Sequence, residues 1–249
     1  MQSCSYAANP TNVWRRVLKT TQICFVFCLL LLSPGLTQAQ SWQSKTTTVN
    51  STTFFPSLPI LLTDGTVICQ DAQTSDWWKL TPDAFGNYVT GTWIQIASMP
   101  AGYGPLYYAS AVLADGRVVV LGGEYNVGSG GTPVDSKLGA IYDPVANTWT
   151  RLAGPDGWSK IGDASCAVLP DGRFLLANQF GRNGAIMDPT TLTWTALSFT
   201  GKADDSSEEG WTMLQDGTIL TVDCQNGTGA ERYDPKTDTW SSAGSTGRA

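Results

Sequence analysis

The chain has no histidine among its 249 residues. This absence excludes Ser-His-Asp triads, Cys-His pairs and every metal site that needs an imidazole ligand. Charged residues are also scarce, at 14%, and no apolar stripe of helical period is sustained, which argues against amphipathic helices. Hydrophobic residues reach 42%, and there are 26 glycines and 13 prolines. This composition is typical of a globular protein built of many short strands joined by turns.

Residues 1–39 have the plan of a secretory signal peptide. Three basic residues precede the apolar run Ile23–Leu32, and the small-residue site Thr37-Gln38-Ala39 follows it. The run of about ten apolar residues is too short to span a bilayer, which needs roughly 20. We therefore predict cleavage after Ala39, a secreted protein in an extracellular or periplasmic space, and no integral membrane segment in the mature chain.

Cleavage would leave a strongly acidic chain with few cysteines. The mature chain would carry 12 basic and 21 acidic residues, a net charge of −9. Nucleic acid is therefore excluded as a partner, and an anionic membrane surface is unfavourable. The remaining cysteines are Cys69, Cys166 and Cys224, and an odd number permits at most one internal disulfide.

A tryptophan followed 22 residues later by an Asp-Gly pair occurs four times. The pairs are Trp42 with Asp64, Trp93 with Asp115, Trp149 with Asp171, and Trp194 with Asp216. The spacing within a pair is constant, whereas the repeats differ in length. The constant segment predicts a structural unit, and the variable part from each Asp-Gly to the next tryptophan predicts the loops.

Each Asp-Gly pair lies between two apolar runs, as in Ala111–Leu113 and Val118–Leu121 around Asp115. Asp-Gly suits the two positive φ angles of a type I′ turn, so each pair predicts a two-residue β-hairpin. The unbroken apolar character of the runs predicts inner strands that are buried on both faces.

A second turn signal, Asp-Pro, precedes three of the tryptophans by six residues, at Asp143, Asp188 and Asp234. Asp-Pro ends a strand and begins a turn. Each repeat therefore predicts a hairpin, a third strand, an Asp-Pro turn and a fourth strand that ends in tryptophan. The repeats, of between 45 and 56 residues, thus contain four antiparallel strands each.

A four-stranded unit at this period is a propeller blade. Gly122-Gly123 after an apolar strand, followed by Tyr142 and Trp149, resembles the kelch motif. Residues 42–240 as a whole are similar to the kelch-type propellers that include the galactose oxidase superfamily, although only the second copy keeps the double glycine. The predicted fold is all-β, a kelch-type β-propeller with about four blades of four antiparallel strands in an incomplete ring.

The two ends of the repeat pattern indicate a fragment. Trp42 has the spacing to Asp64 but no hairpin before it, so its strand is expected to complete another blade. Trp240 predicts an Asp-Gly pair near position 262, beyond Ala249. We therefore predict a propeller domain over residues 40–249 that is truncated before the next blade. The alternative is a closed four-bladed ring, in which the Trp42 strand joins the last blade.

Polar side chains recur about eight positions before the Asp-Gly pairs. In kelch propellers the strand that enters this hairpin is innermost, so the resemblance implies that these side chains converge on the mouth of the central channel. The site predicted there for ligand binding consists of Tyr107, Tyr108, Asp163, Glu208 and Glu209, and the first copy has Pro56. The alternative is that they are solvated loop residues between blades.

Two further groups of residues are weaker candidates. The acidic run Asp204–Glu209 offers oxygen ligands for a hard cation but lacks the spacing and the glycine of a calcium loop, so a solvated acidic turn is expected. Four tryptophans outside the repeat position either stack on sugar rings or peptides or pack between blades. They are Trp77, Trp78, Trp158 and Trp211.

The sequence favours an exported binding module for extracellular carbohydrate or protein, with no catalytic residue, metal or cofactor in these residues. The resemblance implies a second hypothesis, the N-terminal part of a galactose-oxidase-like copper radical oxidase. Those oxidases use two tyrosines, two histidines and a cysteine cross-linked to one tyrosine. No copper ligand can be carried over, because the chain lacks histidine and no motif matches around Tyr107, Tyr108 or Cys69. A third hypothesis is a lyase or hydrolase that works with the carboxylates Asp163 and Glu208.

Overall fold

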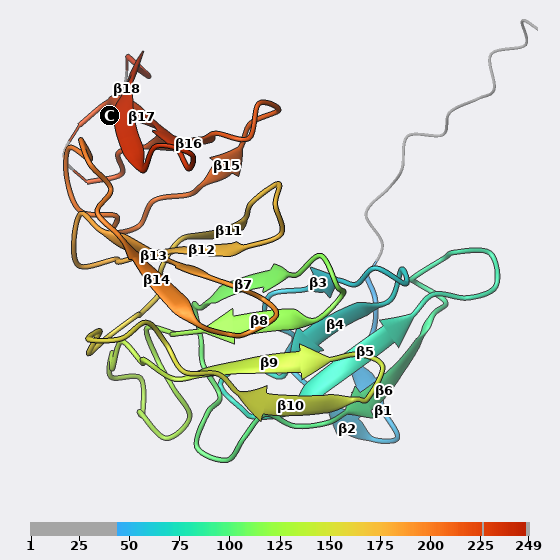
Figure 1. Cartoon of the computed structure of the whole chain (residues 1–249). Helices are drawn as coiled ribbons and strands as arrows, with labels where there is room; N and C mark the ends of the chain where they lie inside the picture. The colour runs from blue at the N-terminus through green and yellow to red at the C-terminus, as the bar shows by residue number, and fades with distance from the viewer. Residues whose placement is uncertain (1–43, 226, 248–249) are drawn as a thin grey trace, which may run out of the picture. The chain divides into compact units, whose positions relative to one another are not determined.

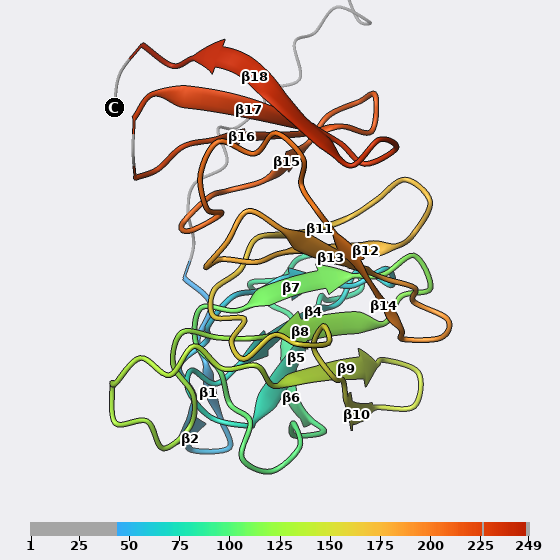
Figure 2. The same cartoon turned by 60° about the vertical axis from the view of Figure 1, so that its left-hand side comes forward.

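Four sheets of four antiparallel strands follow one another along the chain (Figure 1). The computed structural model describes residues 44–225 and 227–247, so the predicted signal peptide and Trp42 lie outside the described residues. The described residues form eighteen β-strands and no helix. The predicted all-β class and the four four-stranded blades are confirmed, and the four sheets do not close into a ring (Figure 2).

The strands pair in chain order within each sheet. The first sheet consists of β3 (Ile60–Leu61), β4 (Val67–Gln70), β5 (Trp77–Thr81) and β6 (Thr92–Ile96). The second consists of β7 (Ala109–Val112), β8 (Val118–Leu121), β9 (Gly139–Asp143) and β10 (Thr148–Arg151). The third consists of β11 (Cys166–Val168), β12 (Phe174–Ala177), β13 (Gly184–Met187) and β14 (Trp194–Leu197). The fourth consists of β15 (Thr212–Met213), β16 (Ile219–Val222), β17 (Gly229–Asp234) and β18 (Thr239–Ser245). A separate hairpin pairs β1 (Thr48–Val49) with β2 (Thr52–Thr53).

The part of the chain that the structure describes contains no helix of the length and apolarity that a bilayer crossing requires.

The Asp-Gly pairs form hairpin turns, but not of the predicted type. In the second sheet, Gly116 N donates to Leu113 O at 2.9 Å and Leu113 N donates to Arg117 O at 2.8 Å. Only the glycine of the Asp-Gly pair has a positive φ, +89° at Gly116. The same two bonds recur in the other three hairpins. The loop therefore has three residues, a tight turn followed by a left-handed glycine, instead of a two-residue type I′ turn.

The aspartate of each pair explains why this three-residue loop forms. Asp115 Oδ1 accepts a hydrogen bond from Arg117 N at 3.0 Å, and Asp171 Oδ1 accepts one from Arg173 N at 3.1 Å. Such a bond from a side chain to the backbone two residues on stabilises a turn without help from the rest of the protein. Because the aspartate needs a negative φ for this bond, the positive φ falls on glycine alone.

The repeat tryptophan lies at the beginning of the outermost strand, and not at its end as predicted. Trp149 is the second residue of β10, and Trp194 is the first residue of β14. In the second sheet, Asp143 Oδ1 accepts hydrogen bonds from Val145 N and Ala146 N, which closes a tight turn after β9. The outer strand β10 can therefore begin at Thr148, one residue before the tryptophan. The 22-residue step still leads from the outer strand of one sheet to the Asp-Gly hairpin of the next.

The two middle strands of the sheets carry most of the core. Every residue of β8, β12 and β13 is buried. The first strand is only half-buried in the second and third sheets, at β7 and β11. The prediction of burial on both faces is therefore correct for the second strand of the hairpin and wrong for the first, because the first strand is an edge strand with a pairing neighbour on one side only.

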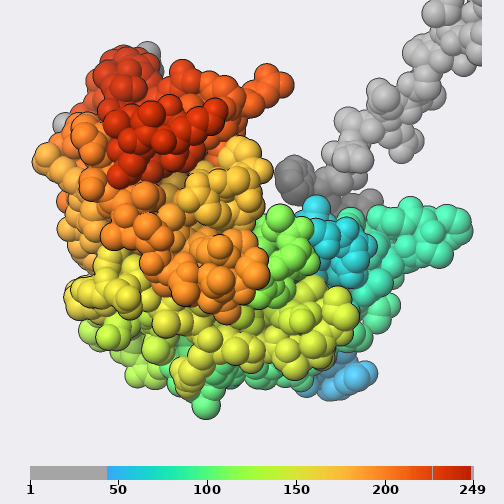
Figure 3. Space-filling view, viewed as in Figure 1, coloured from blue at the N-terminus to red at the C-terminus, as the bar shows by residue number. Residues whose placement is uncertain are grey.

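The hydrophobic core lies between the sheets. One cluster joins the first sheet to the second through Trp77 and Tyr142, and another joins the second to the third through Leu121 and Phe174. A third cluster, which contains Trp240, joins the third sheet to the fourth, and the residues of these two sheets are in contact in the space-filling view (Figure 3, orange and red). An aromatic side chain that buries about 150–250 Å² contributes on the order of 4–6 kcal/mol before entropy is subtracted. Packing alone therefore explains the repeat tryptophans.

The segment before the first sheet covers the face of that sheet that no other sheet contacts. Phe54 stacks on Trp78 with ring centroids 4.7 Å apart, and both belong to a small cluster with Cys69. Trp93 Nε1 donates to Thr46 O at 3.1 Å. The described residues after Trp42 thus lie on the first sheet. The prediction that the Trp42 strand completes another blade falls on residues outside those described.

Candidate functional site

The two ends of the sheets differ in the connections that they carry. The Asp-Gly and Asp-Pro turns lie at one end, which we call the turn end. The other end, which we call the loop end, carries the segments that link one sheet to the next (97–108, 152–165 and 198–211) and those that join second and third strands (71–76, 122–138, 178–183 and 223–225). Antiparallel pairing in chain order places all of these segments at the same end.

Segments of the loop end hold one another in place by hydrogen bonds between residues far apart in sequence. Gly104 N donates to Asn126 Oδ1 at 2.9 Å, and Gly123 N donates to Gly162 O at 2.6 Å. The double glycine permits the second contact. Gly122 has φ +78°, and a Cβ atom there would lie 2.2 Å from Gly162 O. The kelch-like Gly122-Gly123 pair is therefore required by close backbone packing.

Three carboxylates at the loop end come from segments beside three different sheets, and two of them raise the pKa of the third. They are Glu124, which follows β8, Asp163, which precedes β11, and Glu208, which precedes β15. We call these three residues the acidic mouth. The charge of Asp163 is the main cause that raises the pKa of Glu208, followed by burial and by Glu124. This effect is compatible with the predicted convergence of Asp163 and Glu208, which stays a prediction.

No basic side chain neutralises the acidic mouth. None of its three carboxylates forms an ion pair with a lysine or arginine among residues 44–225 and 227–247. Asp163 Oδ1 is buried without a hydrogen-bond partner in the described part of the chain. Burial raises the pKa of Asp163, and the neighbouring Asp135 raises it further. The site therefore has an uncompensated negative charge that a cationic group would relieve.

Tyr107 lies on the exposed side of the loop end, as predicted. Its side chain is 57% exposed and its ring lies edge-on to that of Tyr125, with centroids 6.0 Å apart. Glu124 N donates to Tyr107 O at 3.1 Å, which ties the tyrosine to the acidic mouth. Tyr107 and Glu208, at equivalent positions before their hairpins, both have positive φ, +54° and +59°. This backbone conformation is uncommon for residues other than glycine and is found at functional sites.

Tyr108 and Glu209, in contrast, do not reach the mouth. Tyr108 is buried between the first and second sheets, 6.4 Å from the ring of Trp77, and burial raises its pKa. Glu209 is buried next to the fourth sheet. Each of these two residues is thus buried, whereas the residue that precedes it, Tyr107 or Glu208, is exposed. Pro56 pairs with Asp71 at the edge of the first sheet and does not join the acidic mouth.

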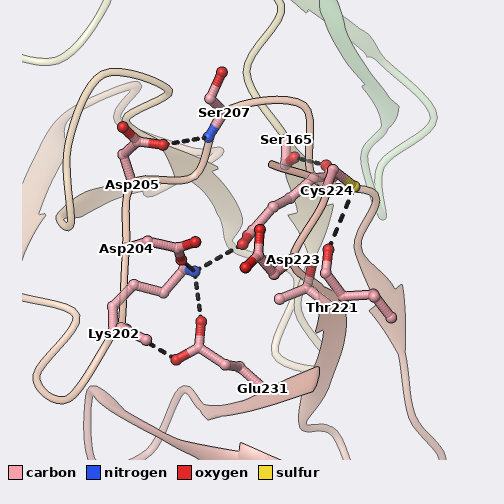
Figure 4. A network of polar contacts seen from close by, with 12 residues as sticks. Ser165, Lys202, Asp204, Asp205, Ser207, Thr221, Asp223, Cys224 and Glu231 are labelled. Atoms are coloured by element: carbon pink, nitrogen blue, oxygen red, sulfur yellow. Dashed lines mark hydrogen bonds and ion pairs between the residues drawn. The ribbon is translucent and has the colours of Figure 1, made fainter. Parts of the chain in front are cut away.

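Glu209 instead belongs to a buried cluster around Lys202. Figure 4 shows Lys202, Asp204 and Glu231 of this cluster. Lys202 Nζ donates to Glu231 Oε2 at 2.6 Å, to Glu209 Oε1 at 2.7 Å and to Asp204 Oδ1 at 2.9 Å. The lysine side chain is 0% exposed. Burial alone would lower the pKa of Lys202, but the hydrogen bonds that its ammonium donates to Glu209, Glu231 and Asp204 outweigh burial and raise that pKa. The lysine is therefore held in its charged form.

The Lys202 cluster corrects the interpretation of the acidic run 204–209 as a solvated turn. Asp204, Glu209 and Glu231 present carboxylate oxygens within 4.8 Å of one another, the separation expected of metal ligands. The Lys202 ammonium, however, already binds all three carboxylates. An internal cation thus occupies the position that a metal ion would take, which agrees with the expectation that this run is not a calcium loop.

Sequence reasoning missed Glu124, Lys202 and Glu231. Glu124 directly follows the double glycine, a position that the predicted site did not include. Lys202 and Glu231 are single charged residues in an ordinary polar context, 29 positions apart. Nothing in the local pattern indicates that these two residues meet.

The four tryptophans outside the repeat position have different environments. Trp77 and Trp78 are buried in the first sheet, and Trp211 packs against the cluster between the third and fourth sheets. Trp158 alone of the four lines a cavity that is described below. Trp158 also packs against the cluster between the second and third sheets, so all four tryptophans contribute to the core.

The three cysteines of the described chain are free thiols. Burial raises the pKa of Cys69 to about 12 and that of Cys166 to about 12, which keeps both thiols protonated at neutral pH. Cys224 is exposed on the loop end. No disulfide joins any two of the three cysteines in the described residues.

Comparison with known proteins supports the fold. No protein-family model matches the chain. Over 89 residues, which is 36% of the chain, it is 35% identical to Kelch-like protein terF of Aspergillus terreus, and the match covers 18% of that protein. The chain therefore spans less than a fifth of this relative.

Solved structures show the same architecture at low sequence identity. The chain aligns with YjhT at a TM-score of 0.52 and 15% identity, over 78% of this chain and 68% of that one. It aligns with virginiamycin B lyase from Staphylococcus aureus at a TM-score of 0.53 and 11% identity, over 75% of this chain and 54% of that one. Both neighbours are β-propellers. The described residues therefore have the fold of a kelch-type β-propeller, and part of the chain resembles a kelch-like protein.

Proposed function

We propose that this chain is an interaction module whose acidic mouth binds a cationic segment of a protein partner. The observation that carries the proposal is that Asp163 and Glu124 both raise the pKa of Glu208, while none of the three carboxylates forms an ion pair among the described residues. Bringing like charges together is unfavourable, and a Lys or Arg side chain of a partner would reverse this effect.

Two further features support a protein ligand. Tyr107 and Tyr125 border the carboxylates, and tyrosine is enriched at protein interfaces and attracts cations over its ring. The chain has a formal net charge of −6, which steers basic partners toward it. Kelch domains are generally protein-interaction modules. The proposed function needs no cofactor and no catalytic residue.

Peptide binding tests the proposal. Three labelled peptides of equal length, one rich in lysine and arginine, one neutral and one acidic, are titrated with the full chain while fluorescence anisotropy is measured. The basic peptide is expected to bind, and its affinity should fall as salt rises because exposed charges are screened. The double substitution Asp163→Asn/Glu208→Gln should weaken this binding by about tenfold or more.

A matched double substitution controls for net charge. Asp156 and Asp234 are outside the acidic mouth, so Asp156→Asn/Asp234→Asn removes the same charge and should leave the affinity within about twofold. Equal binding of all three peptides, or an affinity that the Asp163→Asn/Glu208→Gln change does not alter, would overturn the proposal. Binding of a neutral oligosaccharide but not of the basic peptide would favour the carbohydrate ligand instead.

We also propose that the protein is exported, on the basis of the signal-peptide pattern of residues 1–39. The test is N-terminal sequencing of the chain recovered from the medium or periplasm of cells that express it. A mature chain that begins at Gln40 is expected. A chain that keeps residues 1–39 and stays inside the cell would contradict export.

A further inference from the structure

A cavity lies at the loop end beside the ends of β9 and β10, apart from the acidic mouth. Its volume is about 540 Å³, and it is lined by Lys137–Gly139, Arg151–Trp158 and Ile161. This volume lies in the range of small-molecule sites, about 300–1,000 Å³. It contains none of the residues of the acidic mouth or of the predicted site.

One side of the cavity is apolar and aromatic. Trp158 is partly exposed and borders both this cavity and a second one next to it. Leu138, Leu152 and Ile161 add aliphatic surface. No atom lies within 4 Å of the position that a Cβ at Gly157 would take, so the space next to this neighbour of Trp158 is open. A flat ring with an apolar face fits against such a surface.

The charged residues of the cavity are two basic groups and one acidic group. Arg151 is fixed in place because its guanidinium donates to Ala101 O at 2.8 Å. Lys137 is exposed and forms no ion pair within residues 44–225 and 227–247. With Asp156, the lining carries one net positive charge on a chain whose formal net charge is −6. A local basic site on an acidic protein points to an anionic ligand.

We propose that this cavity binds a small monocarboxylate carried on a ring with an apolar face, with the ring against Trp158 and the carboxylate between Lys137 and Arg151. Arginine and lysine form charge-assisted hydrogen bonds with carboxylates, and a net charge of one matches a monoanion. Both an aromatic acid and a sugar acid have this chemistry. The inference does not rest on the proposed function, because the two sites share no residue.

The test uses ring-matched probes and the indole N–H signals of the full chain in ¹H–¹⁵N NMR. Benzoate, benzyl alcohol and benzylamine share a ring and differ in charge, and the Trp158→Phe variant identifies the Trp158 signal. Benzoate should shift this signal in a saturable way, benzyl alcohol should bind about tenfold more weakly, and benzylamine should not bind. Glucuronate, titrated in the same way, distinguishes a sugar acid from an aromatic acid as the source.

Two double substitutions locate the carboxylate. Lys137→Gln/Arg151→Gln should weaken benzoate binding by about tenfold or more, whereas Arg182→Gln/Lys236→Gln, which removes two exposed charges elsewhere, should change it by less than about twofold. Circular dichroism verifies that each variant is folded. No shift of the Trp158 signal with either acid, equal affinity for benzoate and benzylamine, or an unchanged affinity in Lys137→Gln/Arg151→Gln would each overturn the proposal.

Discussion

At the turn end, each Asp-Gly loop satisfies its own backbone through a single aspartate, whereas at the loop end the connecting segments depend on residues from other sheets. Asp171 accepts hydrogen bonds from the backbone N and the Nε of Arg173, two positions along the same hairpin. Gly123, in contrast, bonds to Gly162 of the next connecting segment. The turn end therefore forms from local sequence, and the loop end forms only when the sheets assemble.

The charges follow the same division. The four Asp-Gly aspartates have lowered pKa values. The main cause is a hydrogen bond from Thr66 at Asp64, from Arg173 at Asp171 and from Thr218 at Asp216. At Asp115, burial would raise the pKa, but the hydrogen bonds from Arg117 outweigh burial. Asp163 and Glu208 at the loop end have raised pKa values. Unfavourable ionisation persists in a fold where it serves a site. The pKa shifts of these carboxyl groups thus have opposite signs at the two ends of the sheets.

The largest expected effect comes from the buried lysine of the loop end. Lys202→Met leaves Glu209 and Glu231 buried without their cation, so the free energy of unfolding should fall by about 3–5 kcal/mol. Urea unfolding followed by tryptophan fluorescence measures this loss. The control Lys236→Met, at an exposed position, should change stability by less than about 0.5 kcal/mol.

A triple variant separates lost charge pairing from lost packing. Lys202→Met/Glu209→Gln/Glu231→Gln removes the unpaired charges and should recover about half of the loss or more. A Lys202→Met protein as stable as the Lys236→Met control would show that the cluster does not stabilise the loop end.

The next effect tests the contact between connecting segments. Gly122→Ala places a Cβ atom 2.2 Å from Gly162 O, whereas Gly130 has a similar positive φ with no atom within 4 Å. Both alanines are strained, but only Gly122→Ala overpacks, so it should reduce the free energy of unfolding by about 2 kcal/mol more than Gly130→Ala. If urea unfolding shows equal losses of stability for the two variants, Gly122 is needed only for its positive φ and not for the close contact with Gly162 O.

A smaller effect is expected from the turn end. Asp171→Ala removes the acceptor for Arg173 N and should reduce the free energy of unfolding by about 1 kcal/mol. Asp171→Asn keeps an acceptor oxygen and should reduce it by less. Thermal unfolding of the two variants compares them. If both substitutions are equally destabilising, the ion pair with Arg173 matters more than the turn hydrogen bond.

The smallest effect is a pH dependence with opposite signs at the two ends. A raised pKa, as at Asp163 and Glu208, means that the native state binds protons more tightly than the unfolded chain, so stability rises slightly as the pH falls through the raised values. The lowered pKa of Asp171 means that its contribution is present above the ordinary value of 3.8 and is lost as the pH falls through the lower folded value.

Calorimetry between about pH 7 and about pH 3 measures this profile. Stability should rise slightly in mild acid and fall below the ordinary aspartate value of 3.8. In Asp163→Asn/Glu208→Gln the rise should be smaller, although Glu209, whose pKa burial raises, still contributes to it. In Asp171→Asn the loss in stronger acid should be smaller. A steady loss of stability from neutral pH downward would contradict the contrast between the two ends.

Local signals in the sequence were enough to find most of the fold. The Asp-Gly and Asp-Pro pairs mark turns because the aspartate side chain bonds the backbone within a few residues, and the apolar runs mark strands because they carry the core. The errors were also local. The predicted turn type was wrong because Asp115 accepts a hydrogen bond from Arg117 N and does not adopt the positive φ that a type I′ turn needs. The position of Trp149 in its strand was wrong because spacing does not specify register.

The sequence by itself determined the repeat and the four antiparallel strands of each sheet, since both depend on spacing along the chain, and it predicted the convergence of Asp163 with Glu208. Only the tertiary structure decided which neighbours face the mouth. It turned Tyr108 and Glu209 inward, brought Lys202 to Glu231, and placed Glu124 beside Glu208. The physical reason is that strand pairing fixes the backbone locally, whereas the partner of a charged side chain depends on how separate sheets pack against one another.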